Sequence, residues 1–160
     1  MLFRSAVQDH ARLEALLGLA VPEVWFEDAW VAQLRLDQLR ADPAFGSWSI
    51  RAIALKETGE VLGSINCHHQ PMPFAANGET RLAIEIGYAI FAPWQRRGFG
   101  HEAVCGFAAW ANRQGVESLV LSIAPANRAS LALAQKLGAI KIGSQIDEKD
   151  GPEDIFLARI

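Results

Sequence analysis

The sequence predicts one α+β domain, an α/β sandwich in which a mixed, mostly antiparallel sheet of about six to seven strands is flanked by about four helices. The 160 residues are 51% hydrophobic and 21% charged, which suits one globular core. Runs of β-rich composition alternate with helical periodicity along the chain. No repeat or low-complexity stretch interrupts this pattern, so residues 1–160 are expected to form a single domain.

The N-terminal third is expected to be helical. Asp9 can cap a first helix that ends near Ala20, because its carboxylate can accept from a free N–H of the first turn. Pro22 suits the start of a second helix that runs to Leu39. The aromatic residues at near-helical spacing in that helix are interpreted as core; they are Trp25, Phe26 and Trp30.

An antiparallel β-meander should follow. The runs 48–55 and 61–67 are rich in β-formers and are joined by a turn at 57–60, which predicts a hairpin. A longer strand is expected over 80–91. Residues 70–80 show no clear periodicity and are expected to form a loop.

The C-terminal half alternates helices and strands. Apolar residues at helical spacing predict a core-facing helix over 99–113; they are Val104, Phe107, Ala108 and Ala111. The remaining elements are a strand at 118–123, a helix at 128–137 closed by Gly138, and strands at 140–144 and 155–160 around a turn at 150–151. The predicted order is ααβββαβαββ.

Charge and cysteine content exclude several classes of protein. The net charge is -3 with both signs mixed along the chain, so no nucleic-acid partner is expected. Cys67 and Cys105 are too few for a disulfide framework, which fits a reducing compartment. The first residues lack the pattern of a signal peptide, and no apolar run approaches about 18 residues. A cytoplasmic protein without a membrane partner is therefore expected.

Residues 85–103 carry the most informative pattern, a strand that passes through a glycine loop into a helix. Gly98 and Gly100 let the main chain approach a ligand, and the first N–H groups of the helix favour an anion. Arg96 and Arg97 add positive charge, so the segment predicts a pyrophosphate site. An ordinary strand-to-helix corner explains the glycines equally well. A Walker A loop is excluded by its missing Gly-Lys-Ser/Thr run, and antiparallel strands disfavour a dinucleotide fingerprint.

These residues resemble those of the GCN5-related N-acetyltransferases, the GNAT enzymes. The family's phosphate loop, Gln/Arg-x-x-Gly-x-Gly/Ala, is matched at every defined position, by Gln95, Gly98 and Gly100. The chain looks most like the branch that includes the ribosomal-protein N-terminal acetyltransferases. It shares three sequence runs with that branch, Glu85–Tyr88, Asn127–Ser130 and Lys136–Gly138.

The resemblance implies that acetyl-coenzyme A lies in a cleft where the sheet opens between the strand ending near Phe91 and the strand at 118–123. Phe91 would offer main-chain groups to the pantetheine arm. The residues implied around the pyrophosphate are Gln95, Arg96, Arg97, Gly98, Phe99 and Gly100, and those implied on the far wall are Asn127 and Ser130. The family transfers the acetyl group directly to an amine, so no metal is expected.

Glu85 is the candidate general base. Strand alternation puts it on the face opposite Ile84 and Ile86, beside the small residue Gly87, as a strand lining a substrate cleft requires. Partial burial is expected to raise its pKa towards that of a useful base. A solvated Glu85 paired with an Arg or Lys across the sheet is the alternative.

Ser130 is the candidate acid that protonates the leaving thiolate, directly or through a water. Many relatives use a tyrosine there, but the corresponding residue is Ala134, and the only tyrosine, Tyr88, is expected on the core face. Asn127 could instead cap its helix, with Ser130 merely filling the first turn. His68 and His69 should point to opposite faces, so at most one faces the cleft and they form no metal site with the preceding cysteine.

The expected function is transfer of an acetyl group from acetyl-coenzyme A to a primary amine, either a protein N-terminus or a small molecule. The alternative is a non-catalytic module that binds or senses acyl-coenzyme A. The N-terminal helices and the 70–80 loop vary among relatives and help to form the acceptor pocket, so the resemblance does not identify the acceptor. Exposed sheet edges leave a homodimer open.

Overall fold

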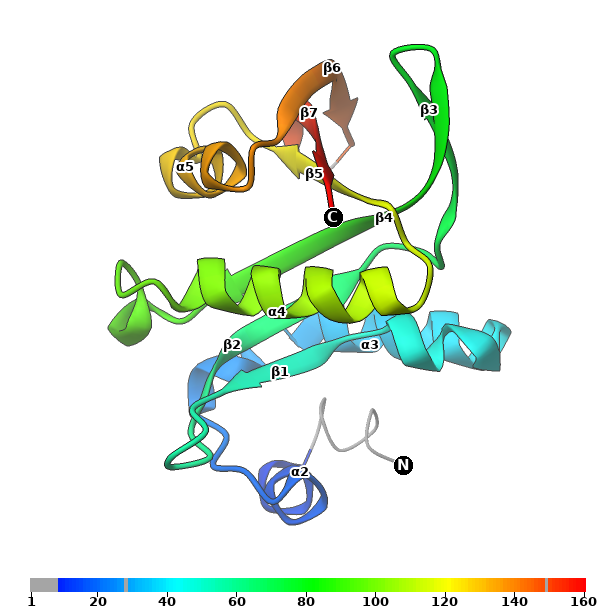
Figure 1. The fold of residues 1–160 in the computed structure, drawn as a ribbon. Helices are drawn as coiled ribbons and strands as arrows, with labels where there is room; N and C mark the ends of the chain where they lie inside the picture. Colours follow the sequence, from blue (N-terminus) through cyan, green and yellow to red (C-terminus); the bar gives the residue numbers. More distant parts are fainter. Residues whose placement is uncertain (1–8, 28, 149) are drawn as a thin grey trace. The chain divides into compact units, whose positions relative to one another are not determined.

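The computed structural model describes residues 9–27, 29–148 and 150–160, and it consists of two compact units (Figure 1). The first unit contains the described residues up to Asn66 together with Tyr88–Phe99. The second contains Cys67–Gly87 and Gly100–Ile160. Strand β4 (Glu79–Ile90) runs through both units. The expectation of a single domain stays a prediction.

Helices dominate the N-terminal part of the first unit. They are α2 (His10–Leu17), η1 (Glu23–Phe26), α3 (Ala29–Ala41) and η2 (Pro43–Trp48), where η denotes a 3-10 helix. A further 3-10 helix of this unit, η3 (Ala92–Trp94), follows β4. The predicted cap of α2 is confirmed, because the Asp9 carboxylate accepts from the N–H of Arg12. The prediction of one helix from Pro22 to Leu39 is wrong, since a separate 3-10 turn precedes α3.

The hydrophobic core of the first unit includes Trp25. This core consists of Leu13, Val21, Trp25, Ala32 and Val61. Trp25 is thus core as predicted, and Phe26 packs against the cluster. The same prediction is wrong for Trp30, whose side chain is 50% exposed because it lies on the outer face of α3.

Strands β1 (Arg51–Ala54) and β2 (Val61–Cys67) form the predicted antiparallel hairpin, with Arg51 opposite Ile65. The first strand starts later than predicted, because η2 occupies the chain up to Trp48. Next to β2, the end of β4 approaches closely. A Cβ added at Gly63 would lie 2.0 Å from the carbonyl oxygen of Ala89, so only glycine fits there.

The second unit contains a strand that the sequence analysis missed, β3 (Met72–Ala76), in place of the expected loop. It pairs antiparallel with β4, from Met72 opposite Ala83 to Ala76 opposite Glu79. The turn between the two strands is Asn77-Gly78, and both residues have positive φ angles, 52° and 80°. Proline and alanine lower the β-propensity of this segment, which explains the miss.

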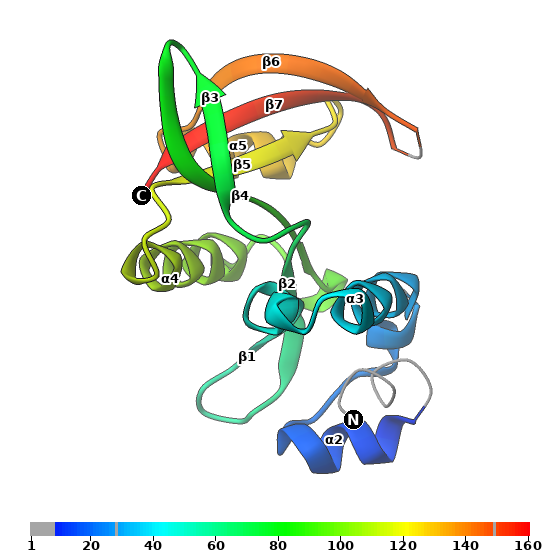
Figure 2. The ribbon, with the colours of Figure 1, turned by 90° about the vertical axis from the view of Figure 1, so that its right-hand side faces the viewer.

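The strands form one mixed, mostly antiparallel sheet in the order β1-β2-β4-β5-β7-β6, with β3 paired to β4, which confirms the predicted fold class. The C-terminal strands are β5 (Ser118–Ile123), β6 (Ile140–Asp147) and β7 (Gly151–Arg159), and β5, β7 and β6 run side by side (Figure 2). The parallel pairing of β4 with β5 spans only Ala83–Glu85 against Ser118–Val120. Glu85 is therefore the last residue of β4 that pairs with β5.

Helices α4 (Phe99–Arg113) and α5 (Arg128–Lys136) follow the predicted bounds closely. The predicted apolar stripe of α4 is buried as expected, at Val104, Phe107, Ala108 and Ala111. No helix in the described part of the chain is long and apolar enough to cross a membrane.

Candidate active site

Glu85 lies at the centre of a polar network in the second unit. Its Oε1 accepts a hydrogen bond from Ser122 Oγ at 2.6 Å, and His68 Nδ1 lies 3.4 Å from the same oxygen. The main-chain N–H of His68 also donates to the carbonyl of Glu85, at 3.0 Å. The Glu85 side chain is 21% exposed and that of His68 is 43% exposed, so the pair is accessible from the His68 side.

The network continues onto β6 and β7. Gln145 Nε2 lies 3.4 Å from Ser122 Oγ and donates to Glu153 Oε2 at 3.0 Å. Ser122 donates its own proton to Glu85, so its lone pairs remain to accept from Gln145. The order of hydrogen bonds is thus Glu153, Gln145, Ser122 and Glu85. This arrangement fixes the carboxylate of Glu85 in one orientation.

The pKa of Glu85 is lowered, which corrects the expectation that burial would raise it. Burial does act to raise this pKa, and it is the largest single influence. The hydrogen bonds from His68 and Ser122 and the charges of the two histidines act in the opposite direction and together outweigh burial. Glu85 is therefore an ionised carboxylate at neutral pH.

Sequence reasoning missed the partners of Glu85. The alternative weighed there was an Arg or Lys across the sheet, whereas the structure shows a histidine and a serine. One signal was available for Ser122: it alternates with Val120, which pairs with Glu85, so both strand positions face the same side. His68 follows the last residue of β2, where strand alternation no longer predicts the direction of a side chain.

Asn127 and Ser130 lie at the N-terminus of α5. The Asn127 Oδ1 accepts from the main-chain N–H of Ser130 at 3.1 Å, which confirms the helix-cap reading of Asn127. Ser130 is partly buried in the first turn of the same helix. Ala134, where the resemblance led us to look for a tyrosine, is 1% exposed and faces the protein interior.

The glycine loop belongs to the first unit up to Phe99. Gln95 Nε2 donates to the carbonyl of Ile90 at 2.8 Å, which ties the loop to the end of its own strand. The guanidinium of Arg97 stacks over Trp94, 4.7 Å from the ring centroid, and over Phe99 at 5.3 Å. The side chains of Gln95 and Arg97 thus contact the loop itself, and the main chain of the loop is left to meet a ligand.

The main-chain geometry of this loop suits a phosphate group. Gly98 has a φ of 91° and Arg96 a φ of 59°, so two residues in close succession are left-handed. A Cβ at Gly98 would meet no described atom of the first unit within 4 Å, which leaves room beside the main chain. Helix α4 begins directly afterwards, and its first N–H groups have no partner one turn earlier. The residues therefore fit an anion of the kind that coenzyme A carries.

Phe91 fits its expected role only in part. Its N–H already donates to the carbonyl of Leu62 at 2.8 Å, and its carbonyl accepts from the N–H of Trp94 at 2.9 Å. Because a carbonyl oxygen has two lone pairs, one lone pair of Phe91 remains for an amide of a pantetheine arm.

The model of the acetyltransferase (GNAT) domain family matches residues 6–140 of the chain. The match covers Glu85, His68, Ser122 and the glycine loop, whereas Gln145 and Glu153 lie beyond it.

Solved structures with this fold include a GnaT-family protein from Bordetella pertussis, at a TM-score of 0.61 and 21% identity, which covers 79% of this chain and 74% of its own. The ribosomal-protein-S5-alanine acetyltransferase from Vibrio fischeri matches at a TM-score of 0.60 and 18% identity, covering 99% and 88%. Ard1 from Thermoplasma volcanium matches at 0.61 and 17%, covering 81% and 79%. At these identities the likeness concerns the fold.

Proposed function

The chain belongs to the GNAT acetyltransferase family, and from this premise we propose that it moves the acetyl group of acetyl-coenzyme A directly to a primary amine. The acceptor is a protein N-terminus or a small molecule. The observation that carries the proposal is the contact between Glu85 and His68, because the reaction needs a group that removes a proton from the acceptor.

The lowered pKa makes Glu85 a weak base by itself, so we assign proton removal to the pair. With a proton on Nδ1, His68 donates towards Glu85 and leaves Nε2 as the acceptor of the amine proton. The carboxylate then stabilises the imidazolium that forms. Ser122 keeps Glu85 in place for this task.

The remaining candidate residues serve the bound donor, which supplies a thioester with an activated acetyl group. Gln95, Arg96, Arg97, Gly98, Phe99 and Gly100 form the loop that would hold its pyrophosphate, with the carbonyl of Phe91 and the amide of Asn127 as further contacts. The acceptor nitrogen bonds to the acetyl carbon as the C–S bond breaks. Ser130, or a water that it holds, gives the thiolate a proton.

The test is calorimetric titration with acetyl-coenzyme A, followed by an acetyl-transfer assay over a panel of amines. The panel includes peptides with ribosomal-protein N-termini, spermidine, amino acids and an aminoglycoside. Saturable binding and transfer that is lost in Glu85→Gln, with binding retained, support the proposal. Binding without transfer to any amine favours the non-catalytic module. No binding by the intact chain overturns the cofactor assignment.

A further inference from the structure

A cavity of about 370 Å³ lies entirely within the second unit. Its walls come from the β3–β4 hairpin, from the turn after α5 and from β7. The lining residues are Phe74, Ala76, Asn77, Glu79, Arg81, Ala83, Leu137, Gly138, Ile140, Leu157 and Arg159. This volume falls in the range of small-molecule sites, roughly 300–1,000 Å³.

The register of the strands explains why these side chains meet. Phe74 pairs with Arg81 and Ala76 pairs with Glu79, and paired residues project from the same face of a sheet. On β7, Leu157 and Arg159 alternate onto one face. The cavity thus has apolar walls and a charged end, and it lies on the face of β4 that carries Glu85, as Ala83 and Glu85 also alternate.

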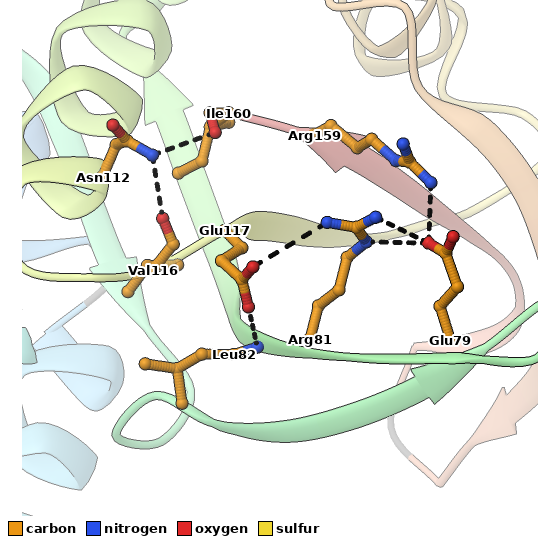
Figure 3. A network of polar contacts seen from close by, with 8 residues as sticks. All are labelled: Glu79, Arg81, Leu82, Asn112, Val116, Glu117, Arg159 and Ile160. Carbon is orange, nitrogen blue, oxygen red and sulfur yellow. Dashed lines mark hydrogen bonds and ion pairs between the residues drawn. The ribbon is translucent and has the colours of Figure 1, made fainter.

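The charged end has more donors than acceptors (Figure 3). Glu79 Oε2 receives Arg81 Nη2 at 2.6 Å, Arg81 Nε at 3.1 Å and Arg159 Nη2 at 2.7 Å, and these contacts lower the pKa of Glu79. Arg81 Nη1 is 3.8 Å from Glu117 Oε1. Within the described residues of the second unit, Nε and Nη1 of Arg159 meet no acceptor.

A buried hydroxyl belongs to Ser118, which stands between two lining residues but does not itself line the cavity. Ser118 is 0% exposed, and its Oγ has no hydrogen-bond partner among the described residues. It pairs with Ala83 on one side and with Arg159 on the other, and both of these line the cavity.

We propose that this cavity binds a small carboxylate with an apolar body. The carboxylate meets the free donors of Arg159, for which a planar guanidinium is the matching partner, and the apolar body packs on Phe74, Leu137 and Leu157. A cationic ligand is disfavoured, because the one carboxylate in the lining is already held by two arginines. The carboxylate end of this site is separate from the Glu85 network, since Arg81 precedes Glu85 by four residues, about 13 Å along an extended strand, whereas only the wall at Ala83 comes within two residues of Glu85.

The experiment titrates the full chain, without acetyl-coenzyme A, against three probes of one size: phenylacetate, its neutral amide phenylacetamide, and the cation phenethylamine. Calorimetry at constant ionic strength should show saturable binding of phenylacetate at least about tenfold tighter than of the other two. Equal binding of the amide, tighter binding of the cation, or no saturation by phenylacetate overturns the proposal. Because the donor is absent, the outcome is independent of the proposed enzymatic function.

Two variants locate the site. Arg159→Gln should weaken the binding of phenylacetate by about tenfold or more. Arg113→Gln, which removes an exposed arginine from the last turn of α4, should leave the affinity for phenylacetate unchanged. Ala76→Phe should fill the cavity and abolish binding without a change of charge. Circular dichroism checks that each variant is folded. If Arg159→Gln and Ala76→Phe both bind like the parent chain, the proposal is wrong.

Discussion

The glycine loop and the Glu85 network perform their proposed tasks by different means. In the loop the main chain carries the site: Arg96 and Gly98 are left-handed, and the side chains of Gln95 and Arg97 support the loop. In the Glu85 network side chains from separate strands carry the site, and β4 contributes only Glu85. The loop site thus consists of consecutive residues, whereas the residues of the Glu85 network are far apart in the sequence and meet only when the chain folds.

The first way to test this contrast is to remove the side chains of the network. Glu85→Gln and His68→Gln should each reduce kcat by about 100-fold to 10,000-fold, because each abolishes the proton-accepting pair. The affinity for acetyl-coenzyme A should change little, since the loop is untouched. Steady-state kinetics and calorimetry measure both quantities.

His69→Gln is the graded comparison: its ring contacts the carbonyl of Gln70 and acts on Glu85 only through its charge, so this variant should reduce kcat much less than His68→Gln. The double variant of Glu85 and His68 should be no slower than either single variant, because the pair acts as one unit. Full activity in His68→Gln would show that Glu85 works without the histidine.

The second test changes the main chain of the loop. Gly98→Trp should weaken acetyl-coenzyme A binding by about 100-fold or more. The indole would fill the open space beside the main chain that we assign to the pyrophosphate, and a residue with a side chain is strained at the positive φ of Gly98. Gly115→Trp is the matched control, because that glycine has a φ of 90° against 91° for Gly98 and also borders open space. Both should lose similar stability in urea unfolding. Equal loss of binding in the two variants would contradict a site at the loop.

A smaller effect is expected when only the support of Glu85 is removed. Ser122→Ala deletes the 2.6 Å hydrogen bond that lowers the pKa of Glu85, so that pKa should rise. The rate should fall by about tenfold, and the acidic limb of the pH–rate profile should move to higher pH. Ser144→Ala, which deletes a hydrogen bond to Asp154, should leave the profile in place.

The smallest effect concerns stability against acid. The folded-state pKa of Glu85 lies below its unfolded value, so this group stabilises the fold above the unfolded pKa, and the contribution disappears as the pH falls through the folded pKa. Urea unfolding of the parent chain and of Glu85→Gln should differ at neutral pH and converge in acid. The stability of Gly98→Trp should depend on pH as that of the parent chain does. If Gly98→Trp lost this pH dependence, the dependence could not be assigned to Glu85.

The same contrast explains how much the sequence could predict. The bounds of α4 and β5 were predictable, because their apolar periodicity is strong and local. β3 was missed since its pattern is weak and it depends on pairing with β4. Trp30 was misassigned because spacing alone does not tell which face of a helix meets the core.

For the site, the family motif in consecutive residues located the loop, and strand alternation placed Glu85 on the face opposite Ile84 and Ile86. The contact between Glu85 and Ser122 joins residues separated by 37 positions, which no local pattern reveals. For the same reason the pKa of Glu85 was predicted with the wrong sign: burial is visible in the sequence, whereas the hydrogen bonds that outweigh it are not.

Gly63 has a practical consequence for mutational scanning. Every other residue type at this position would drive a Cβ into the carbonyl of Ala89, so an activity screen would score all nineteen replacements as inactive. In an activity screen, Gly63 would therefore look the same as a catalytic residue, at which every replacement also abolishes activity. A parallel measurement of protein abundance separates the two cases, because replacements at Gly63 should deplete the folded protein whereas Glu85→Gln should lower its amount far less.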